Sequence, residues 1–283
     1  MSKWIKTAGL LAAAGLVYSA GIEPYCIGTE KVEILCPRLP RAFDGYTIVQ
    51  VSDLHMRQMG RRERSIVRAI QSIDEPDIVV LTGDLIHTTA GIEPFLEIAR
   101  TLRARDGVFA VFGNSEHKNG VDPLAFGRRL SSAGVTCLPN LNVKIERGDA
   151  VFYVAGVDDP ASGYDDLDRA LEGIDVNAFV LLLMHSPDPI AFAASRGIDV
   201  VLSGHTHGGQ IKLPLVGAPL THSWHGTRMN SGYYSGESLQ KVIGARPGRT
   251  RLYVTRGLGV SGLALRFLCP PELSIITLRS FAV

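Results

Sequence analysis

Residues 46–55 read YTIVQVSDLH, a stretch in which an apolar, β-branched run ends in two polar side chains, Asp53 and His55. Such a run is typical of a buried β-strand. In α/β sheets, ligand sites lie just beyond the carboxyl ends of the strands. Residues i and i+2 of an extended chain point to the same side. Asp53 and His55 are therefore expected to reach one metal ion.

The same arrangement recurs along the chain, with an apolar run followed at once by a residue that can bind a metal. Gly83, Gly113 and Gly204 precede three of these residues, and glycine permits sharp turns and close backbone approach. We expect all of these side chains to meet at one edge of the sheet. They are Asp84 after DIVVLTGD, Asn114 after VFAVFGN, His185 after FVLLLMH, and His205 and His207 in DVVLSGHTH.

The pattern of runs predicts the fold class. Strand-like runs alternate with helix-like stretches from about residue 30, which indicates a layered α/β domain. The tail at 250–279 resembles two short strands, and residues 140–157 a hairpin turning at Gly148-Asp149, so mixed pairing and more than one sheet are expected (α+β character). No linker interrupts residues 29–283, which predicts one catalytic domain. The strand-like runs are 46–52, 77–82, 107–112, 151–157, 178–184 and 198–203, and the helix-like stretches are 63–74, 92–105, 122–133 and 187–196.

Composition excludes several classes of protein. Of the 283 residues, 46% are hydrophobic and 20% are charged, which excludes a disordered chain. The net charge is +1, which argues against a nucleic-acid binder that relies on bulk charge. Four cysteines are too few for a disulfide scaffold.

The N-terminus differs from the rest of the chain. Residues 7–22, TAGLLAAAGLVYSAGI, carry no charge and follow two lysines, although the run is slightly shorter than the roughly 20 residues of a spanning helix. A cleaved signal peptide, an uncleaved signal anchor and an ordinary buried helix remain open. Tyr18 is a poor residue two places before a cut at Ala20, which favours attachment over cleavage. We therefore predict that residues 1–28 are a membrane anchor or signal anchor and that the protein is membrane-associated, with the side of the membrane left open.

The seven candidate ligands also predict which metals bind. Mixed carboxylate, amide and imidazole donors suit manganese, iron, zinc or nickel rather than calcium. Seven ligands are too many for one tetrahedral ion but suit two divalent ions, with manganese as the first expectation. Two metals roughly 3.5–4 Å apart clamp phosphoryl oxygens and supply hydroxide near neutral pH.

These motifs together resemble the full motif set of the calcineurin-like metallophosphoesterases. The resemblance rests on the segments SDLH at 52–55, GD at 83–84, GN at 113–114, His185 and GHTHGGQ at 204–210. GHTHGGQ, the preceding HSPD and the C-terminal CPPELSIITL resemble the membrane-associated YkuE/YaeI-type subgroup. The resemblance implies a four-layer double β-sandwich flanked by helices, and a hydroxide between the metals that attacks phosphorus in line. It also implies the ligand sets, namely Asp53, His55 and His207 for one ion, Asn114, His185 and His205 for the other, and Asp84 bridging both.

The sequence departs from the family at one position. The family usually has histidine directly after the motif asparagine, whereas here the run is Asn114-Ser115-Glu116-His117. Ser115 cannot act as a cation. His117 is therefore predicted to take the role of the absent family histidine, as a catalytic residue alongside Asp84. General acid catalysis typically raises a reaction rate by about 10²–10⁴-fold. Hydrolysis of an anhydride would be slowed least by the loss of this acid, because the leaving phosphate needs no proton.

Basic and aromatic residues near the motifs are candidates for substrate binding. Arg57 and Arg61 belong to a basic cluster after the first motif, which is either a solvated helix face or a contact for anionic groups. His225 lies with His222 in a loop that contains Trp224, and it either lines the substrate mouth or packs within the loop. We predict that Arg57, Arg61 and His225 bind substrate.

The predicted function is hydrolysis of a phosphoester or pyrophosphate in a small-molecule or lipid-linked substrate. The pyrophosphate of UDP-2,3-diacylglucosamine is one candidate, because some enzymes similar to this subgroup hydrolyse it. A general phosphomonoesterase or phosphodiesterase is the first alternative, and a catalytically weak metal-binding scaffold is an alternative of another class. No nucleic-acid partner is expected.

Overall fold

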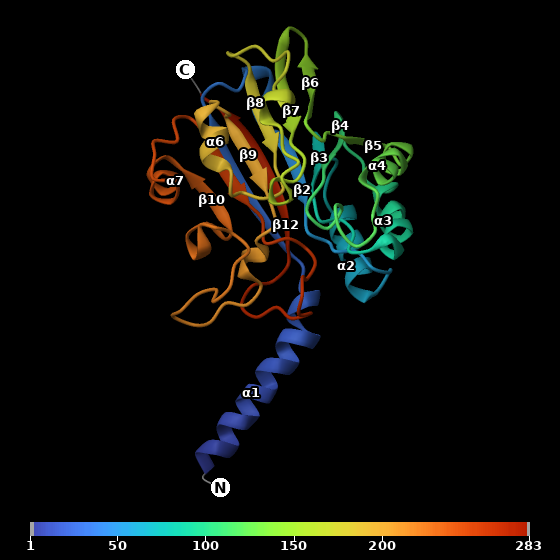
Figure 1. Ribbon diagram of the computed structural model, residues 1–283, viewed down its shortest axis with the longest axis vertical. Coiled ribbons are helices and arrows are strands. Elements are labelled where there is room, and N and C mark those ends of the chain that lie inside the picture. The colour runs from blue at the N-terminus through green and yellow to red at the C-terminus, as the bar shows by residue number, and fades with distance from the viewer. Residues whose placement is uncertain (1–2, 282–283) are drawn as a thin grey trace.

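Two six-stranded mixed β-sheets form the centre of the protein, for which the computed structural model describes residues 3–281 (Figure 1). The first sheet has the order β1 (Gly28–Cys36), β12 (Glu272–Ser280), β2 (Tyr46–Val51), β3 (Ile78–Thr82), β4 (Gly107–Val111) and β5 (Val135–Cys137). The second has the order β10 (Gly232–Ser235), β11 (Arg251–Val254), β9 (Val200–Ser203), β8 (Phe179–Leu183), β7 (Ala150–Gly156) and β6 (Leu141–Arg147).

The two sheets pack face to face through one apolar core. Ile48 and Val80 of the first sheet belong to the same buried cluster as Leu181 and Leu202 of the second. Phe152 lies in this core and contacts neighbouring aromatic rings edge to face. Every β-strand presents alternate side chains to its two faces, so the opposite faces of the sheets need separate cover.

Helices supply this cover on both outer faces, which gives four layers (Figure 1). On the first sheet, Phe95 and Phe126 pack in one cluster with Val79. On the second, Ile190 packs with Val201. The prediction of a four-layer sandwich flanked by helices is confirmed. The first sheet carries α2 (Arg61–Gln71), α3 (Ile92–Ala99) and α4 (Pro123–Ser132), and the second carries α5 (Leu167–Ala170), α6 (Ile190–Ser195) and α7 (Gly236–Ile243).

Differences from the sequence predictions include the bounds of two helices and the placement of the two tail strands. The helix expected at 92–105 ends at Ala99, and the Thr101 hydroxyl donates to the carbonyl of Ile98, a local bond that competes with helix continuation. The helix expected at 187–196 begins only at Ile190, after Pro187 and Pro189. The two tail strands join different sheets, since β11 pairs with β9 whereas β12 pairs with β1 and β2.

The N-terminal helix α1 (Lys3–Gly21) projects away from the sheets (Figure 1). Within residues 3–281, no helix combines the length and apolar character that crossing a membrane requires. This finding contradicts the predicted membrane-associated localisation through the N-terminal segment. Half of the uncharged run at 7–22 is alanine and glycine, which add little apolar surface.

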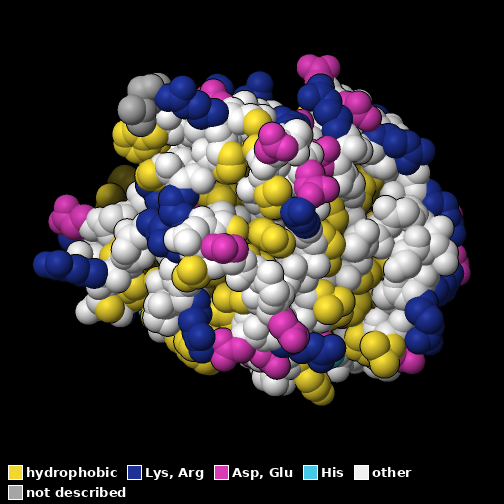
Figure 2. Space-filling view, turned by 90° about the horizontal axis from the view of Figure 1, so that it is seen from above, with side chains coloured by type: hydrophobic (Ala, Val, Ile, Leu, Met, Phe, Trp, Pro, Cys, Tyr) yellow, Lys and Arg dark blue, Asp and Glu magenta, His cyan; other side chains and the backbone are white. Residues whose placement is uncertain are grey.

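The end of the molecule opposite α1 carries both signs of charge. Figure 2 shows Lys and Arg side chains scattered among Asp and Glu side chains there, with apolar side chains between them. No single sign of charge gathers on this face (Figure 2).

Candidate metal centre

All seven predicted metal ligands lie just beyond strand ends. β2, β3 and β4 run parallel in one sheet, and β8 and β9 run parallel in the other, so their carboxyl ends collect at one end of the sandwich. The two sheets are joined close to these ends, because the side-chain amide of Gln50 donates to the carbonyl of Ser203 at 3.0 Å. The site is therefore built from both sheets.

The backbone at the ligands takes an uncommon conformation. Left-handed φ angles are rare for residues other than glycine, and such strain gathers at functional sites. The strand-end turns use this conformation to direct the side chains inward. The ligands with positive φ are Asp53 (54°), His55 (46°), Asp84 (50°), His205 (69°) and His207 (51°).

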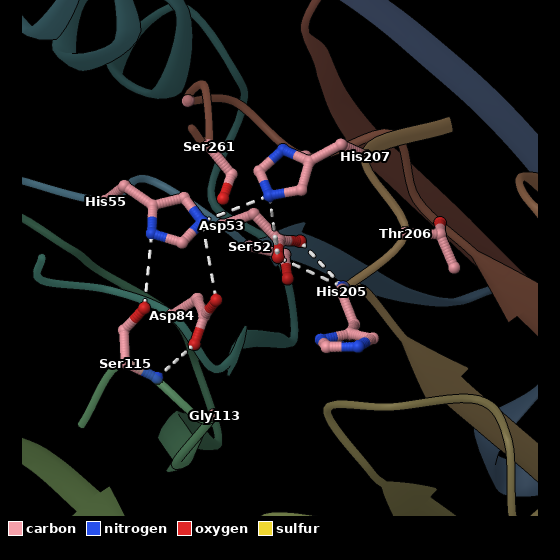
Figure 3. A network of polar contacts seen from close by, with 12 residues as sticks. Ser52, Asp53, His55, Asp84, Gly113, Ser115, His205, Thr206, His207 and Ser261 are labelled. Atoms are coloured by element: carbon pink, nitrogen blue, oxygen red, sulfur yellow. Dashed lines mark hydrogen bonds and ion pairs between the residues drawn. The ribbon is translucent and has the colours of Figure 1, made fainter. Parts of the chain in front are cut away.

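One cluster brings together Asp53, His55 and His207, all of them buried. The Nε2 atoms of His55 and His207 are 3.0 Å apart, and His207 Nε2 is 3.6 Å from Asp53 Oδ1. Figure 3 shows the two imidazoles pointing toward each other above Asp84. Three ligand atoms converge here on one small volume.

A second cluster brings together Asp84, His185 and His205. His205 Nδ1 lies 3.1 Å from His185 Nε2, which is 3.4 Å from Asp84 Oδ1. His185 Nδ1 donates to the carbonyl of Thr82 at 2.8 Å, so its Nε2 is the atom that faces the cluster. This is the usual orientation of a metal-binding histidine.

Asp84 stands between the two clusters. Its Oδ2 is 3.3 Å from His55 Nε2, and its Oδ1 is 3.4 Å from His185 Nε2. Asn114 Oδ1 is buried and has no hydrogen-bond partner among the described residues. Buried polar atoms almost always have a partner, and a bound cation would be the partner of this oxygen. The donor set thus fits two divalent ions with Asp84 between them.

Burial sets the protonation of the imidazoles. Burial lowers the pKa of His55 to about 4 and that of His205 to about 3, and it also lowers the pKa of His207. These rings are neutral near pH 7 and offer lone pairs, as metal ligands must. Burial opposes the charge on His185 too, but the carboxylate of Asp84 outweighs it and raises the His185 pKa to about 10. A metal must therefore displace a proton from His185.

Two glycines let the ligand-bearing turns approach each other. A Cβ atom on Gly83 would lie 2.6 Å from His185 Nδ1, and one on Gly113 would lie 2.5 Å from Asp84 Oδ1. Real Cβ atoms do not tolerate such distances. Any side chain at these positions would push the ligands apart.

Sequence reasoning missed Glu116, which is fully buried beneath the site. Its carboxylate accepts hydrogen bonds from four backbone N–H groups, which tie two ligand-bearing turns together. The only signal in the sequence was an acidic residue two places after Asn114. The donors are Asp84 (3.0 Å), Leu85 (2.8 Å), Ile86 (3.0 Å) and Gly113 (2.8 Å).

Ser115, which stands where the family has histidine, contacts both clusters (Figure 3). Its backbone N–H donates to Asp84 Oδ1 at 2.7 Å. Its hydroxyl oxygen lies 3.3 Å from His55 Nδ1. When His55 carries its proton on Nδ1 and donates to Ser115, Nε2 is left free for a metal.

His117, the predicted substitute for that histidine, forms a pair that sequence reasoning did not find. Its Nε2 lies 2.7 Å from Asp158 Oδ1, and its ring stacks on Tyr164 with centroids 4.4 Å apart. Among the described residues, its hydrogen-bond and ring contacts are with these two and Phe112, and none is with a predicted ligand.

The predicted substrate-binding residues lie at different places. Arg57 and Arg61 line a pocket beside His55. His225 Nε2 lies 3.4 Å from the carbonyl of Asp188. His222 of the same loop is nearer the ligands, with its ring centroid 5.9 Å from that of His205.

The His117–Asp158 pair predicts a pH-dependent contribution to stability. Burial works to lower the pKa of His117, but the hydrogen bond and charge of Asp158 outweigh it and raise the pKa above 6.5. The contribution is therefore complete below the unfolded pKa and is lost as pH rises through the folded pKa. The wild type should exceed His117→Gln in unfolding free energy by more at pH 6 than at pH 9, measured by urea denaturation. Asp158→Asn should show the same trend, and a difference that does not vary with pH would contradict the pairing.

Comparisons with known proteins agree with this geometry. The family described as calcineurin-like phosphoesterase matches residues 46–209. The chain is 32% identical over 277 residues to the uncharacterized metallophosphoesterase YkuE of Bacillus subtilis, covering 96% of this chain and 92% of that protein. It is 31% identical over 208 residues to the phosphodiesterase YaeI of Escherichia coli, covering 72% of this chain and 71% of that protein.

A solved structure also resembles the chain at a lower level. The phosphopantetheinyl hydrolase of Mycobacterium tuberculosis has 12% sequence identity and a TM-score of 0.44, covering 75% of this chain and 89% of that one. A likeness at this level carries no information about the substrate. The family match extends over more than half of the chain and includes every strand end that carries a candidate ligand. The chain therefore belongs to the calcineurin-like phosphoesterases, a family of metal-dependent phosphoester hydrolases.

Proposed function

We propose that this protein is a dinuclear phosphohydrolase with two divalent ions, manganese first among them. Asp53, His55 and His207 would hold one ion, Asn114, His185 and His205 would hold the other, and Asp84 would contribute to both. The observation that supports this most strongly is the placement of the two Asp84 oxygens, one within 3.3 Å of His55 and the other within 3.4 Å of His185. When bound, two such ions neutralise phosphoryl charge and supply hydroxide near neutral pH.

The residues of the chain fix the orientation of these ligands. Ser115 holds Asp84 Oδ1 through its N–H and sets the tautomer of His55 through its hydroxyl. Glu116 holds the turns on which Asp84 and Asn114 stand. Positioning of this kind is needed because misplaced ligands lose affinity and rate.

The same contacts favour substrates with good leaving groups. The Ser115 hydroxyl is used by His55, and the imidazole of His117 is held by Asp158. A serine hydroxyl is too weak an acid to protonate an alkoxide leaving group, and His117 contacts Asp158, Tyr164 and Phe112 rather than any predicted metal ligand. We therefore propose a pyrophosphate bond as the preferred target, with a lipid-linked substrate such as UDP-2,3-diacylglucosamine as the specific candidate.

A general phosphodiesterase is the second candidate. One relative that is similar over most of this chain is named a phosphodiesterase. The two candidates differ in the leaving group and therefore in the need for an acid.

A comparison of three substrates tests the proposal on the full-length, manganese-loaded chain. We expect kcat/KM on the UDP-linked diacyl sugar to exceed that on diethyl phosphate by about 10²-fold or more, because an alkoxide leaving group needs the missing acid whereas a phosphate does not. The third substrate, bis-p-nitrophenyl phosphate, has a leaving group that needs no acid and reports hydrolysis free of that requirement. Equal rates on all three would exclude the anhydride preference. Comparable turnover of bis-p-nitrophenyl phosphate and diethyl phosphate, without cleavage of the UDP-linked sugar, would favour the general phosphodiesterase. Two bound metals without turnover would favour the metal-binding scaffold.

A further inference from the structure

A pocket of about 500 Å³ adjoins the metal ligand His55 and is called the His55 pocket below. Its volume falls in the range of small-molecule sites. One wall comes from the start of α2 and the loop before it, and the opposite wall comes from the N-terminal segment, including Pro24 and Tyr25. Val260 and Ala264 of the C-terminal loop complete it. The pocket is thus assembled from three parts of the chain that are distant in sequence.

The charge of the His55 pocket is positive. Arg57, Arg61 and Arg62 line it, together with one acid, Glu63. Glu63 is already engaged, since it pairs with Arg62 at 2.6 Å and accepts the N–H of Gly60 at 3.0 Å. Among the described residues, Arg57 and Arg61 have no carboxylate within ion-pair distance. An anion that enters the pocket would therefore find two guanidinium groups that are not paired with a carboxylate.

The opposite wall offers an aromatic and apolar surface. The guanidinium carbon of Arg61 lies over the Tyr25 ring, 5.3 Å from its centroid, so the basic and aromatic walls meet in a cation–π contact. Pro24, Val260 and Ala264 extend the apolar part. A ligand that fits both walls carries a negative charge joined to a ring or an apolar chain.

The N-terminal wall is held firmly to the metal site. Glu23 is only 1% exposed, and its carboxylate accepts the backbone N–H groups of Leu268 (2.9 Å) and Cys269. Cys269 Sγ in turn donates to the carbonyl of the ligand His207 at 3.4 Å. The backbone N–H of Arg266 donates to the carbonyl of Ser19 at 2.9 Å. Tyr25 follows Glu23 by two residues and is therefore fixed relative to the ligands.

We propose that the His55 pocket is a substrate subsite for the part of the substrate that does not react, namely a second phosphoryl group attached to a ring or chain. Arg57 and Arg61 pair with the second phosphoryl group, and Tyr25 packs against the ring or chain. This inference rests on the proposed function, because the reacting phosphoryl group must lie at the adjoining metal centre.

Two matched substrates test the subsite. Thymidine 5′-(p-nitrophenyl phosphate) and its 3′-phosphorylated form share the reacting diester and differ only in a second phosphate. For the full-length, manganese-loaded chain, we expect the doubly phosphorylated form to have a KM about tenfold lower, the effect of one charge-assisted contact. Arg61→Gln should remove most of the tenfold difference in KM between the two substrates. Tyr25→Ala should raise KM for both substrates, whereas Tyr25→Phe should have KM values close to those of the wild type.

Arg64→Gln is the matched control, because Arg64 lies on the same helix, is exposed and does not line the pocket. A binding measurement separates the subsite from turnover. In isothermal titration, the dissociation constant of thymidine 3′,5′-bisphosphate should rise about tenfold in Arg61→Gln and stay at the wild-type value in Arg64→Gln. The subsite proposal would be overturned if Arg61→Gln still hydrolyses both substrates and changes neither the KM ratio nor the dissociation constant. Absence of hydrolysis by the wild type with metal bound would instead overturn the proposed function.

Discussion

Asp84→Asn is expected to lower kcat/KM by more than roughly 100-fold. Replacing a residue that only orients a metal ligand already lowers metal affinity or activity by about 10–100-fold, and Asp84 is itself a candidate ligand. Asparagine keeps the size of the side chain but loses the charge and one of the two oxygens that face the clusters. Bound manganese should also fall below two ions per chain. Both quantities are measurable, by hydrolysis of bis-p-nitrophenyl phosphate and by elemental analysis of the purified protein.

Asp149→Asn provides the control for this experiment, because Asp149 is exposed in the turn of the β6–β7 hairpin. It should match the wild type in both rate and metal content. An Asp84→Asn protein that retains two metals and the wild-type rate would exclude Asp84 as the bridging ligand. A protein that loses metal and stability, with no activity in the wild type to lose, would support the scaffold interpretation.

Glu116→Ala is expected to lower the free energy of unfolding by roughly 3–5 kcal/mol, because it leaves four buried backbone donors without an acceptor. Water cannot easily replace the carboxylate, since Glu116 is 0% exposed. Metal affinity should fall as well, by about 10–100-fold, because the turns of Asp84 and Asn114 lose their common anchor. Urea denaturation at an unchanged m-value would report the loss of stability.

Glu97→Ala is a suitable comparison, because Glu97 is exposed on α3. Surface substitutions of this kind usually change stability by no more than about 0.5 kcal/mol. A Glu116→Ala protein within about 1 kcal/mol of the wild type would mean that the four N–H groups find other acceptors, and the role assigned to Glu116 would be wrong.

The positions of the candidate ligands were predictable because strand ends leave a local signature. The runs before Asp84 and His185 are almost continuously apolar and the run before Asp53 is interrupted by Gln50, as expected of strands covered on both faces. β1 was missed because Glu30, Lys31 and Glu33 hide its strand character, and it lies at the edge of its sheet where charges remain exposed.

Other features depend on contacts that no local pattern reveals. The partner of His117 is Asp158, 41 positions away in the chain, and the carboxylate of Glu23 meets N–H groups near residue 269. Positive φ angles at the ligands follow from the fold as a whole. The membrane prediction is wrong for a different reason, because residues 7–22 lack charge but half of them are alanine and glycine, whose apolar area is small.

The place of β12 bears on how the chain reaches its native state during synthesis. β12 lies between β1 and β2, pairing from Gly28↔Glu272 onward on one side and through Ser274↔Gln50 on the other. Although the candidate ligands are all translated by residue 207, the strand next to β2 is translated only at residues 272–280. Such long-range pairing slows folding and exposes strand edges meanwhile. The metal centre is thus expected to mature only after β12 has been translated, and termination of translation before β12 would leave the ligands on an unfinished sheet.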